Sequence, residues 1–360
     1  MRVDRARTIA SLVRWLGPWT PEARVPPARA ETLTVDGRFP ARVYHPPGRP
    51  RGALAIAPGL HHDGPDDRRM DRFCRILAAS GLVTMAPFLP DFVALRVTPA
   101  AIDDFTRAYD AFAAGRPAAP GVFSISFGSL LALRTAAVRP VGGVVVFGGY
   151  ADWDATIRFT VTGELDGRRW VARDWRNLPV VFLNLLDDLG DAPAERAAVV
   201  EAWRRYVAAT WGKHEMRTRE AWEAVARTHA ASVPAAARDF YLRGCGLAPG
   251  AAEAIDGALA RRGKIEFLDV RPHLASVRCP VWITHGVADD VIPWTQAESL
   301  ARAFPAHARP PVHLTGLYGH TQLEGARGPR ALARELSSMV QIVGAIERAA
   351  SAAAPVTSGS

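Results

Sequence analysis

The stretch GVFSISFGSLL, residues 121–131, constrains the fold more than any other part of the chain. A short apolar run over 122–125 leads into Ser126, and a helical pattern follows at once. This order predicts a buried strand, a sharp turn with Ser126 at its tip, and a helix, which is the local structure of a nucleophile elbow. The backbone at such a tip is strained, and residues two positions away must be small because strand and helix approach closely. Gly128 meets this demand, whereas Ser124 stands where glycine is usual, and five residues alone also fit an ordinary strand–helix junction.

Strand patterns recur between helical patterns along the chain; the first two alternate between apolar and polar residues, and the later ones are continuous apolar runs. We expect strands near 31–35, 39–44, 53–57, 82–86, 122–125, 141–147, 281–284 and 312–315. We expect helices after Asp66 or Asp67, over 102–113, after the elbow, over 294–304 and over 329–350. Asp36-Gly37 predicts a hairpin between the first two strands. Unalternating strands that take turns with helices indicate an α/β protein with a mostly parallel, doubly wound sheet.

The strand–helix rhythm breaks after Gly149. The next strand of the same kind begins at Val281, 131 residues on (150 to 280 inclusive), although a crossover needs only about a dozen residues. Helical patterns fill this segment at 195–210, 216–231, 234–242 and 251–262, and 180–186 fits a strand or a helix. Six of the ten tryptophans also fall here: Trp153, Trp170, Trp175, Trp203, Trp211 and Trp222. We expect an inserted helical cap, whose tryptophans form its own core or close over a site.

The domain organisation that follows has four parts. Residues 1–30 form an N-terminal helix and linker, 31–150 and 266–350 the α/β core, 151–265 the cap, and 351–360 a flexible tail. The basic N-terminal pattern lacks a cleavage site and is too short for a membrane span, so we expect a docked helix, no stable membrane insertion and a cytoplasmic protein. The three cysteines (Cys74, Cys245 and Cys279) lie in apolar contexts and predict free thiols.

The net charge of +8 and the pI near 10 invite comparison with nucleic-acid-binding proteins. However, the positive residues are almost all arginine and are scattered along the chain, and no aromatic-and-basic pattern accompanies them. We therefore predict no nucleic-acid partner.

Two later strand ends supply the partners that an elbow serine needs. The run ITHGVADDVIP, residues 283–293, puts Asp289 just beyond a buried strand, and LTGLYGH, residues 314–320, puts His320 beyond the last one. In a doubly wound sheet, ligands bind at the carboxyl ends of strands. The order serine, aspartate, histidine is the one associated with this topology.

Over roughly residues 30–350 the chain resembles the α/β-hydrolase superfamily, on the elbow, the HGVADDVIP run at 285–293 and Gly319-His320. Within the superfamily it is most similar to capped bacterial carboxylesterases, dienelactone hydrolases and acyl-peptidases. The resemblance implies an α/β-hydrolase fold with a cap and an oxyanion turn at 58–62 (PGLHH), although Pro58 replaces the usual histidine. It implies the backbone N–H groups of Leu60 and Phe127 as oxyanion donors.

Several candidates compete with these assignments. Ser124 and Ser129 are expected in the strand and the helix rather than at the tip. The alternatives to Asp289 are Asp290, Asp152 and Asp154. His285 is expected to pack behind the acid. A metal site could be formed by His61, His62 and Asp63. However, adjacent histidines on a turn are not expected to share a face, so we predict no metal. His61 and Trp153 are expected to line the substrate pocket.

These residues predict a serine hydrolase that cleaves an ester, lactone or thioester through an acyl-enzyme, with Ser126 as nucleophile, His320 as base and Asp289 as orienting acid. The expected partner is a small-molecule ester with an apolar acyl or aromatic group, and no cofactor is implied. The alternatives are a peptidase, an amidase or an acyltransferase with the same triad, and a catalytically silent binding protein of this fold. The sequence leaves the oligomeric state open.

Overall fold

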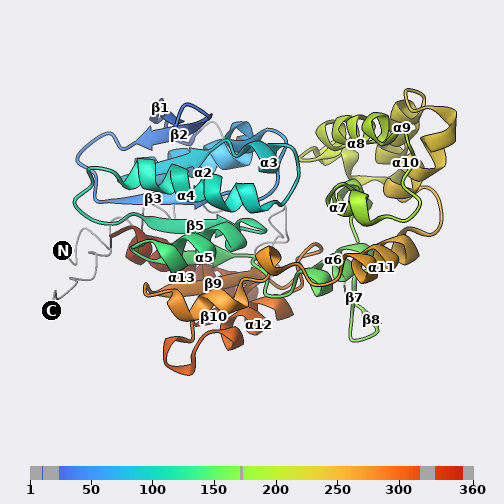
Figure 1. Cartoon of the computed structure of the whole chain (residues 1–360). Helices are drawn as coiled ribbons and strands as arrows, with labels where there is room; N and C mark the ends of the chain where they lie inside the picture. The colour runs from blue at the N-terminus through green and yellow to red at the C-terminus, as the bar shows by residue number, and fades with distance from the viewer. Residues whose placement is uncertain (1–9, 11–23, 171–172, 317–328, 352–360) are drawn as a thin grey trace.

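The computed structural model describes residue 10 and residues 24–170, 173–316 and 329–351, with the backbone alone at 329–336. Its centre is an eight-stranded sheet in the order β1-β2-β4-β3-β5-β6-β9-β10 (Figure 1). The strands are β1 Arg29–Val35, β2 Phe39–His45, β3 Gly52–Ala57, β4 Leu82–Pro87, β5 Gly121–Ile125, β6 Val144–Phe147, β9 Val281–Gly286 and β10 Val312–Thr315. Only β2 runs against the others, because it pairs antiparallel with both β1 and β4. The expected mostly parallel α/β architecture is therefore confirmed.

The hairpin at the start of the sheet turns at the predicted residues. Asp36 and Gly37 both have positive φ, 48° and 69°, as a two-residue turn that matches strand twist requires. Glycine adopts this conformation without steric cost, and aspartate tolerates it better than most residues do.

Helices cover both faces of the sheet, which explains why its central strands are mostly apolar and buried. One face carries α3 Pro90–Val93, α4 Pro99–Ala113, α5 Gly128–Val138 and α12 Thr295–Ala303, and the other carries α2 Arg68–Ala79 and α13 Pro329–Ser351. Each face of the sheet has its own hydrophobic core, and successive residues of β3 pack into opposite cores. Leu54 and Ile56 belong to the core under α2 and α13, and Ala55 belongs to the core on the other face. Both cores fix the strand ends on which the site is built.

The segment between β6 and β9 is mostly helical. It contains α6 Trp153–Thr162, the small hairpin β7 Glu164–Leu165 and β8 Arg168–Arg169, α7 Leu178–Leu185, α8 Arg196–Thr210, α9 Arg219–Ala230, α10 Arg238–Gly244 and α11 Ala251–Arg262. The ambiguous run at 180–186 is helical, in α7. In Figure 1 these helices gather to one side of the sheet. We call residues 151–265 the cap.

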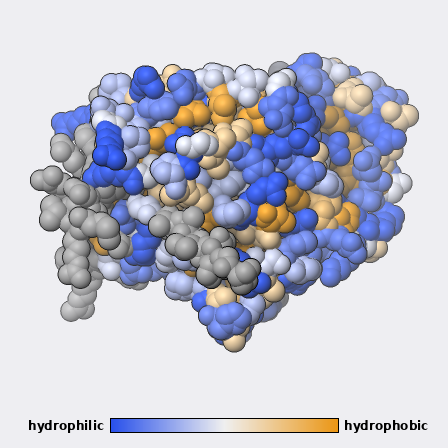
Figure 2. Space-filling view, turned by 60° about the vertical axis from the view of Figure 1, so that its left-hand side comes forward, coloured by the Kyte–Doolittle hydropathy of each residue, from blue (hydrophilic) through white to orange (hydrophobic). Residues whose placement is uncertain are grey.

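On the face of the molecule in Figure 2, apolar residues form small patches between hydrophilic ones. Among the described residues, no helix has the length and apolar character that crossing a membrane requires. The cysteines are free thiols, as predicted; Cys74 and Cys245 are buried and Cys279 is partly buried.

Candidate active site

Ser126 lies at the tip of a sharp turn between β5 and α5. Its φ is +55°, one of four positive values among the described non-glycine residues, and serine rarely adopts this region. The turn is held on both sides: the Ser126 N–H donates to the Phe147 carbonyl at 2.9 Å, and the Ser126 carbonyl accepts from the Ser129 N–H at 3.0 Å. The side chain is therefore positioned by a strained backbone, as an elbow nucleophile requires.

The residues on either side of Ser126 show why small side chains are needed here. A Cβ on Gly128 would lie 2.3 Å from the Ala57 carbonyl oxygen and 2.4 Å from that of Pro58, so only glycine fits. Ser124 is in β5 and fully buried, and its hydroxyl donates to the Val145 carbonyl at 3.3 Å. The serine that replaces the usual glycine thus has a structural role, and Ser124 is not at the tip.

The turn after β3 approaches the nucleophile from the neighbouring strand. A Cβ on Gly59 would lie 3.4 Å from the Ser126 Cβ, so the two backbones are in near contact. Within the described part of the chain, the N–H groups of Leu60 and Phe127 donate to no other protein group. Two unengaged N–H groups beside a candidate nucleophile are what an oxyanion site needs.

Asp289 lies beyond the end of β9, and its side chain is 4% exposed. Its Oδ1 accepts from the N–H groups of Val291 at 2.9 Å and Ile292 at 2.8 Å. These bonds fix the carboxylate, because both donors belong to the same tight loop. Its other oxygen lies 3.5 Å from where a Cβ on Gly148, at the end of β6, would be. Asp289 therefore faces the strand end next to that of Ser126.

The competing acids have other positions. Asp290 is only partly buried. Asp152 caps α6 by accepting from the Ala155 N–H at 3.0 Å. His285 is fully buried behind the acid, with Nε2 2.8 Å from the Ile292 carbonyl oxygen and 3.5 Å from Asp289 Oδ2. His320 lies outside the described residues, so its expected place beside Ser126 stays a prediction.

The sheet order, with β2 alone reversed, and the strained serine between β5 and α5 decide the fold. The chain has the α/β-hydrolase fold. No protein-family model matches it, and no curated protein matches its sequence.

Three solved structures similar to this chain have low sequence identity to it. The 2,6-dihydroxy-pseudo-oxynicotine hydrolase has 17% identity and a TM-score of 0.44, over 92% of this chain and 71% of that one. An α/β fold family hydrolase from Bacillus anthracis str. Sterne has 14% identity and a TM-score of 0.43, over 88% and 98%. The acylaminoacyl peptidase of Pyrococcus horikoshii has 9% identity and a TM-score of 0.44, over 89% of this chain but only 41% of that one.

Five of the six cap tryptophans fall into two groups. Trp203 and Trp222 are buried in the cap, where the Trp203 ring packs 5.6 Å from those of Phe182 and Phe240. Part of the aromatic excess is therefore the cap's own core. The second group contacts the α/β core at the strand ends, and it contains Trp153, Trp170 and Trp211.

Each of these three tryptophans touches a different part of the candidate site. The Trp153 ring lies 5.3 Å from that of Phe127, the residue after the nucleophile. The Trp170 indole N–H donates to the Val287 carbonyl at 3.2 Å, on the loop that carries the acid. The Trp211 ring lies 6.1 Å from that of His61, beside the oxyanion turn. Nothing in the sequence distinguished Trp170 and Trp211 from the core tryptophans, because their contacts join distant segments.

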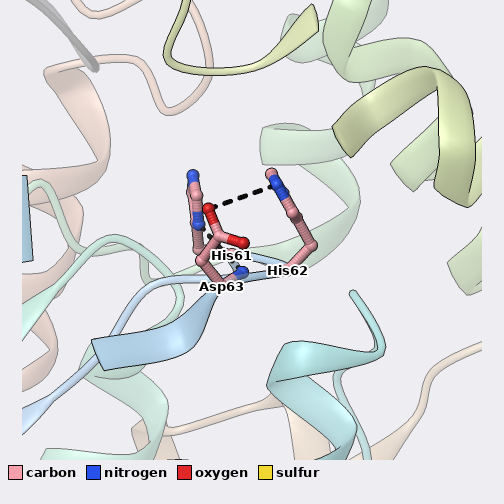
Figure 3. Close-up of side chains that lie close together, drawn as sticks. All are labelled: His61, His62 and Asp63. Carbon is pink, nitrogen blue, oxygen red and sulfur yellow. Dashed lines mark hydrogen bonds and ion pairs between the residues drawn. The ribbon is translucent and has the colours of Figure 1, made fainter. Parts of the chain in front are cut away.

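His61 and His62 correct one expectation. Their rings are stacked, with centroids 4.5 Å apart and planes 24° from parallel (Figure 3), so the two histidines do share a face. Within the same turn, the Asp63 N–H donates to His61 Nδ1 at 3.2 Å. Burial lowers the pKa of His61 to about 4 and also lowers the pKa of His62.

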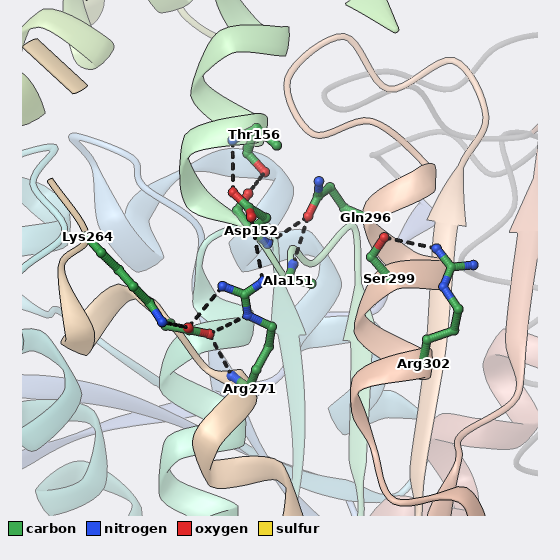
Figure 4. Close-up of polar contacts among 10 residues, drawn as sticks. Ala151, Asp152, Thr156, Lys264, Arg271, Gln296, Ser299 and Arg302 are labelled. Carbon is green, nitrogen blue, oxygen red and sulfur yellow. Dashed lines mark hydrogen bonds and ion pairs between the residues drawn. The ribbon is translucent and has the colours of Figure 1, made fainter. Parts of the chain in front are cut away.

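A polar cluster ties the two ends of the cap together at its base (Figure 4). Asp269 accepts from Arg271 Nε at 2.7 Å and lies 3.1 Å from Lys264 Nζ. Arg271 also lies 3.6 Å from Asp152 at the start of the cap, and the Asp152 N–H donates to Gln296 Oε1 at 2.8 Å. Although burial opposes its ionisation, hydrogen bonds from Arg271 and Lys264 hold the pKa of Asp269 at about 2.

We expect Gly128→Ala to cost about 3 kcal/mol or more, or to prevent folding, because its Cβ would meet two rigid carbonyl groups. Gly257→Ala in α11 is the matched control: its Cβ would meet only the flexible end of Arg261, at 3.3 Å, and alanine should add up to ~1 kcal/mol there. Urea unfolding measures both variants. Equal stabilities would contradict the close approach at the elbow.

We expect Asp269→Asn to destabilise the fold by about 1–2 kcal/mol at pH 7, a figure reduced for its solvent-exposed partners. Because the folded pKa of about 2 lies below the ordinary 3.8, the carboxylate stabilises the fold above pH 3.8, and this is lost as the pH falls through 2. The difference in unfolding free energy from the wild type should therefore narrow below pH 4. Asp256→Asn, which breaks an exposed pair with Arg158, should change stability by less than ~0.5 kcal/mol at either pH.

Proposed function

We propose that the protein is a serine hydrolase that cleaves a carboxylic ester, lactone or thioester through an acyl-enzyme on Ser126. One observation carries the proposal: a serine with φ of +55° lies beside two backbone N–H groups, of Leu60 and Phe127, that donate to no described group. A turn that serves only to join a strand to a helix has no need of a strained serine, and conformational strain of this kind is concentrated at functional sites.

The proposed reaction begins with a proton transfer. His320, whose part rests on the sequence, takes the proton from the Ser126 hydroxyl as its oxygen attacks the ester carbonyl carbon. The carbonyl oxygen becomes negatively charged, and the N–H groups of Leu60 and Phe127 donate to it. Each such donor is worth about 3–4 kcal/mol in the transition state.

The acyl-enzyme then forms and breaks down. His320 returns the proton to the leaving alcohol as the C–O bond breaks, which leaves the acyl group on Ser126. Water, deprotonated by the same imidazole, releases the acid by the reverse sequence. Asp289 accepts from the histidine and stabilises its positive form, and the fixed loop bonds of its carboxylate support this role.

The substrate proposed for this reaction has an apolar or aromatic group. Trp153 and Phe127 lie in ring contact, so apolar surface adjoins the residue after the nucleophile. The Trp153 indole N–H is buried and, among the described residues, has no hydrogen-bond partner. It is thus available to a substrate oxygen, since a buried donor is rarely left unpaired.

We expect a fluorophosphonate probe to label the intact protein and Ser129→Ala but not Ser126→Ala, because only the tip hydroxyl can reach the phosphorus. Ser129 is the matched control, since it is buried in α5 three residues on. Mass spectrometry of the labelled peptide identifies the serine that carries the probe. Labelling of neither the intact protein nor the control would favour a silent binding protein, and faster cleavage of peptide anilides than of esters would favour a peptidase.

We expect Asp289→Asn to lower kcat by roughly three to four orders of magnitude, because asparagine keeps the loop bonds but loses the charge that stabilises the imidazolium. Asp290→Asn, one residue on, should change kcat by less than about tenfold, since loss of charge outside the triad has a small effect. Steady-state hydrolysis of a p-nitrophenyl ester measures both. If Asp290→Asn lowered kcat more than Asp289→Asn does, Asp290 rather than Asp289 would be the orienting acid.

A further inference from the structure

The residues after the oxyanion turn bring three metal-binding groups together. One nitrogen of His61, one of His62 and one carboxylate oxygen of Asp63 all lie within 4.8 Å of one another. Figure 3 shows the two imidazole rings standing side by side with the Asp63 carboxylate at their base. His62 Nε2 is 3.4 Å from Asp63 Oδ2. Three potential ligands therefore converge from consecutive positions of one tight turn.

A fourth group, the Asp67 carboxylate, lies beside His61 and can orient its ring for metal binding. Since His61 Nδ1 accepts from the Asp63 N–H at 3.2 Å, the neutral ring carries its proton on Nε2, which lies 3.3 Å from Asp67 Oδ2. A metal ion would bind the lone pair of Nδ1 and so take the place of the Asp63 N–H. Asp67 is itself fixed, since it accepts from the N–H groups of Arg69 and Met70 at the start of α2. A carboxylate behind a histidine, on the nitrogen that does not bind the metal, is the usual outer arrangement of metal sites.

We propose that His61, His62 and Asp63 form a binding site for one divalent transition-metal ion of the zinc, cobalt and nickel class, with Asp67 as the outer partner of His61. Two imidazoles and a carboxylate suit these ions, whereas calcium and magnesium prefer ligand sets made of oxygen alone. Ligand distances of about 2.0–2.2 Å place neighbouring donors roughly 3.3–3.6 Å apart. His62 Nε2 and Asp63 Oδ2 already lie in this range, at 3.4 Å. The wider separations, which reach at most 4.8 Å, need closing by about 1 Å.

The test uses the untagged full chain, freed of metal and titrated with Co²⁺ by visible absorption and with Zn²⁺ by calorimetry. We expect one ion per chain. His62→Gln and Asp63→Asn should each weaken binding at least tenfold, and Asp67→Asn should weaken it about 10–100-fold. Asparagine keeps the cap of α2, so the last variant tests the outer partner without unfolding the helix.

The control is His307→Gln, on the exposed 3-10 turn Ala306–Ala308, which should bind as tightly as the wild type. Zn²⁺ should also raise the Tm of the wild type but not that of His62→Gln, because only an ion that binds the folded state stabilises it. Absence of saturable binding, or binding that His62→Gln and Asp63→Asn leave unchanged, would overturn the proposal. None of these readouts uses hydrolysis, so the outcome is independent of the proposed function.

Discussion

The contact between the start of α5 and the turn after β3 is the constraint on which the rest of the site depends. At Gly128 the helix backbone lies so close to the carbonyl groups of Ala57 and Pro58 that no side chain fits between them. Two residues before this approach, Ser126 adopts a positive φ. The closest backbone contact at the strand–helix junction therefore lies directly beside the candidate nucleophile.

Local chemistry made the α/β core predictable from the sequence. The Asp36-Gly37 turn, the unalternating apolar strands and the small residue at Gly128 each act through neighbours within a few positions, and all three appear in the structure as expected. The spacing Gly-x-x-Asp at the end of β9 favours Asp289 over Asp290 as the orienting acid, and this choice stays a prediction. The run at 180–186 was ambiguous because a short, wholly apolar segment fits either period, and only its packing in the cap decides for a helix.

Contacts between distant segments could not be predicted in this way. Trp170 and Trp211 meet the acid loop and the oxyanion turn across the boundary between cap and core, and no spacing in the sequence encodes such a meeting. The stacking of His61 on His62 was missed for a different reason. The expectation was that adjacent histidines on a turn do not share a face, whereas in this turn the two rings stack and the Asp63 N–H donates to His61.

The polar cluster around Asp269 has a consequence for how the protein can evolve. The cap leaves the core at Asp152 and returns near Arg271, and these two side chains lie only 3.6 Å apart. A segment whose two ends meet can be lengthened, shortened or exchanged without moving the strands that flank it. The scaffold that bears Ser126 and the inserted helical segment can therefore change in sequence and length at different rates.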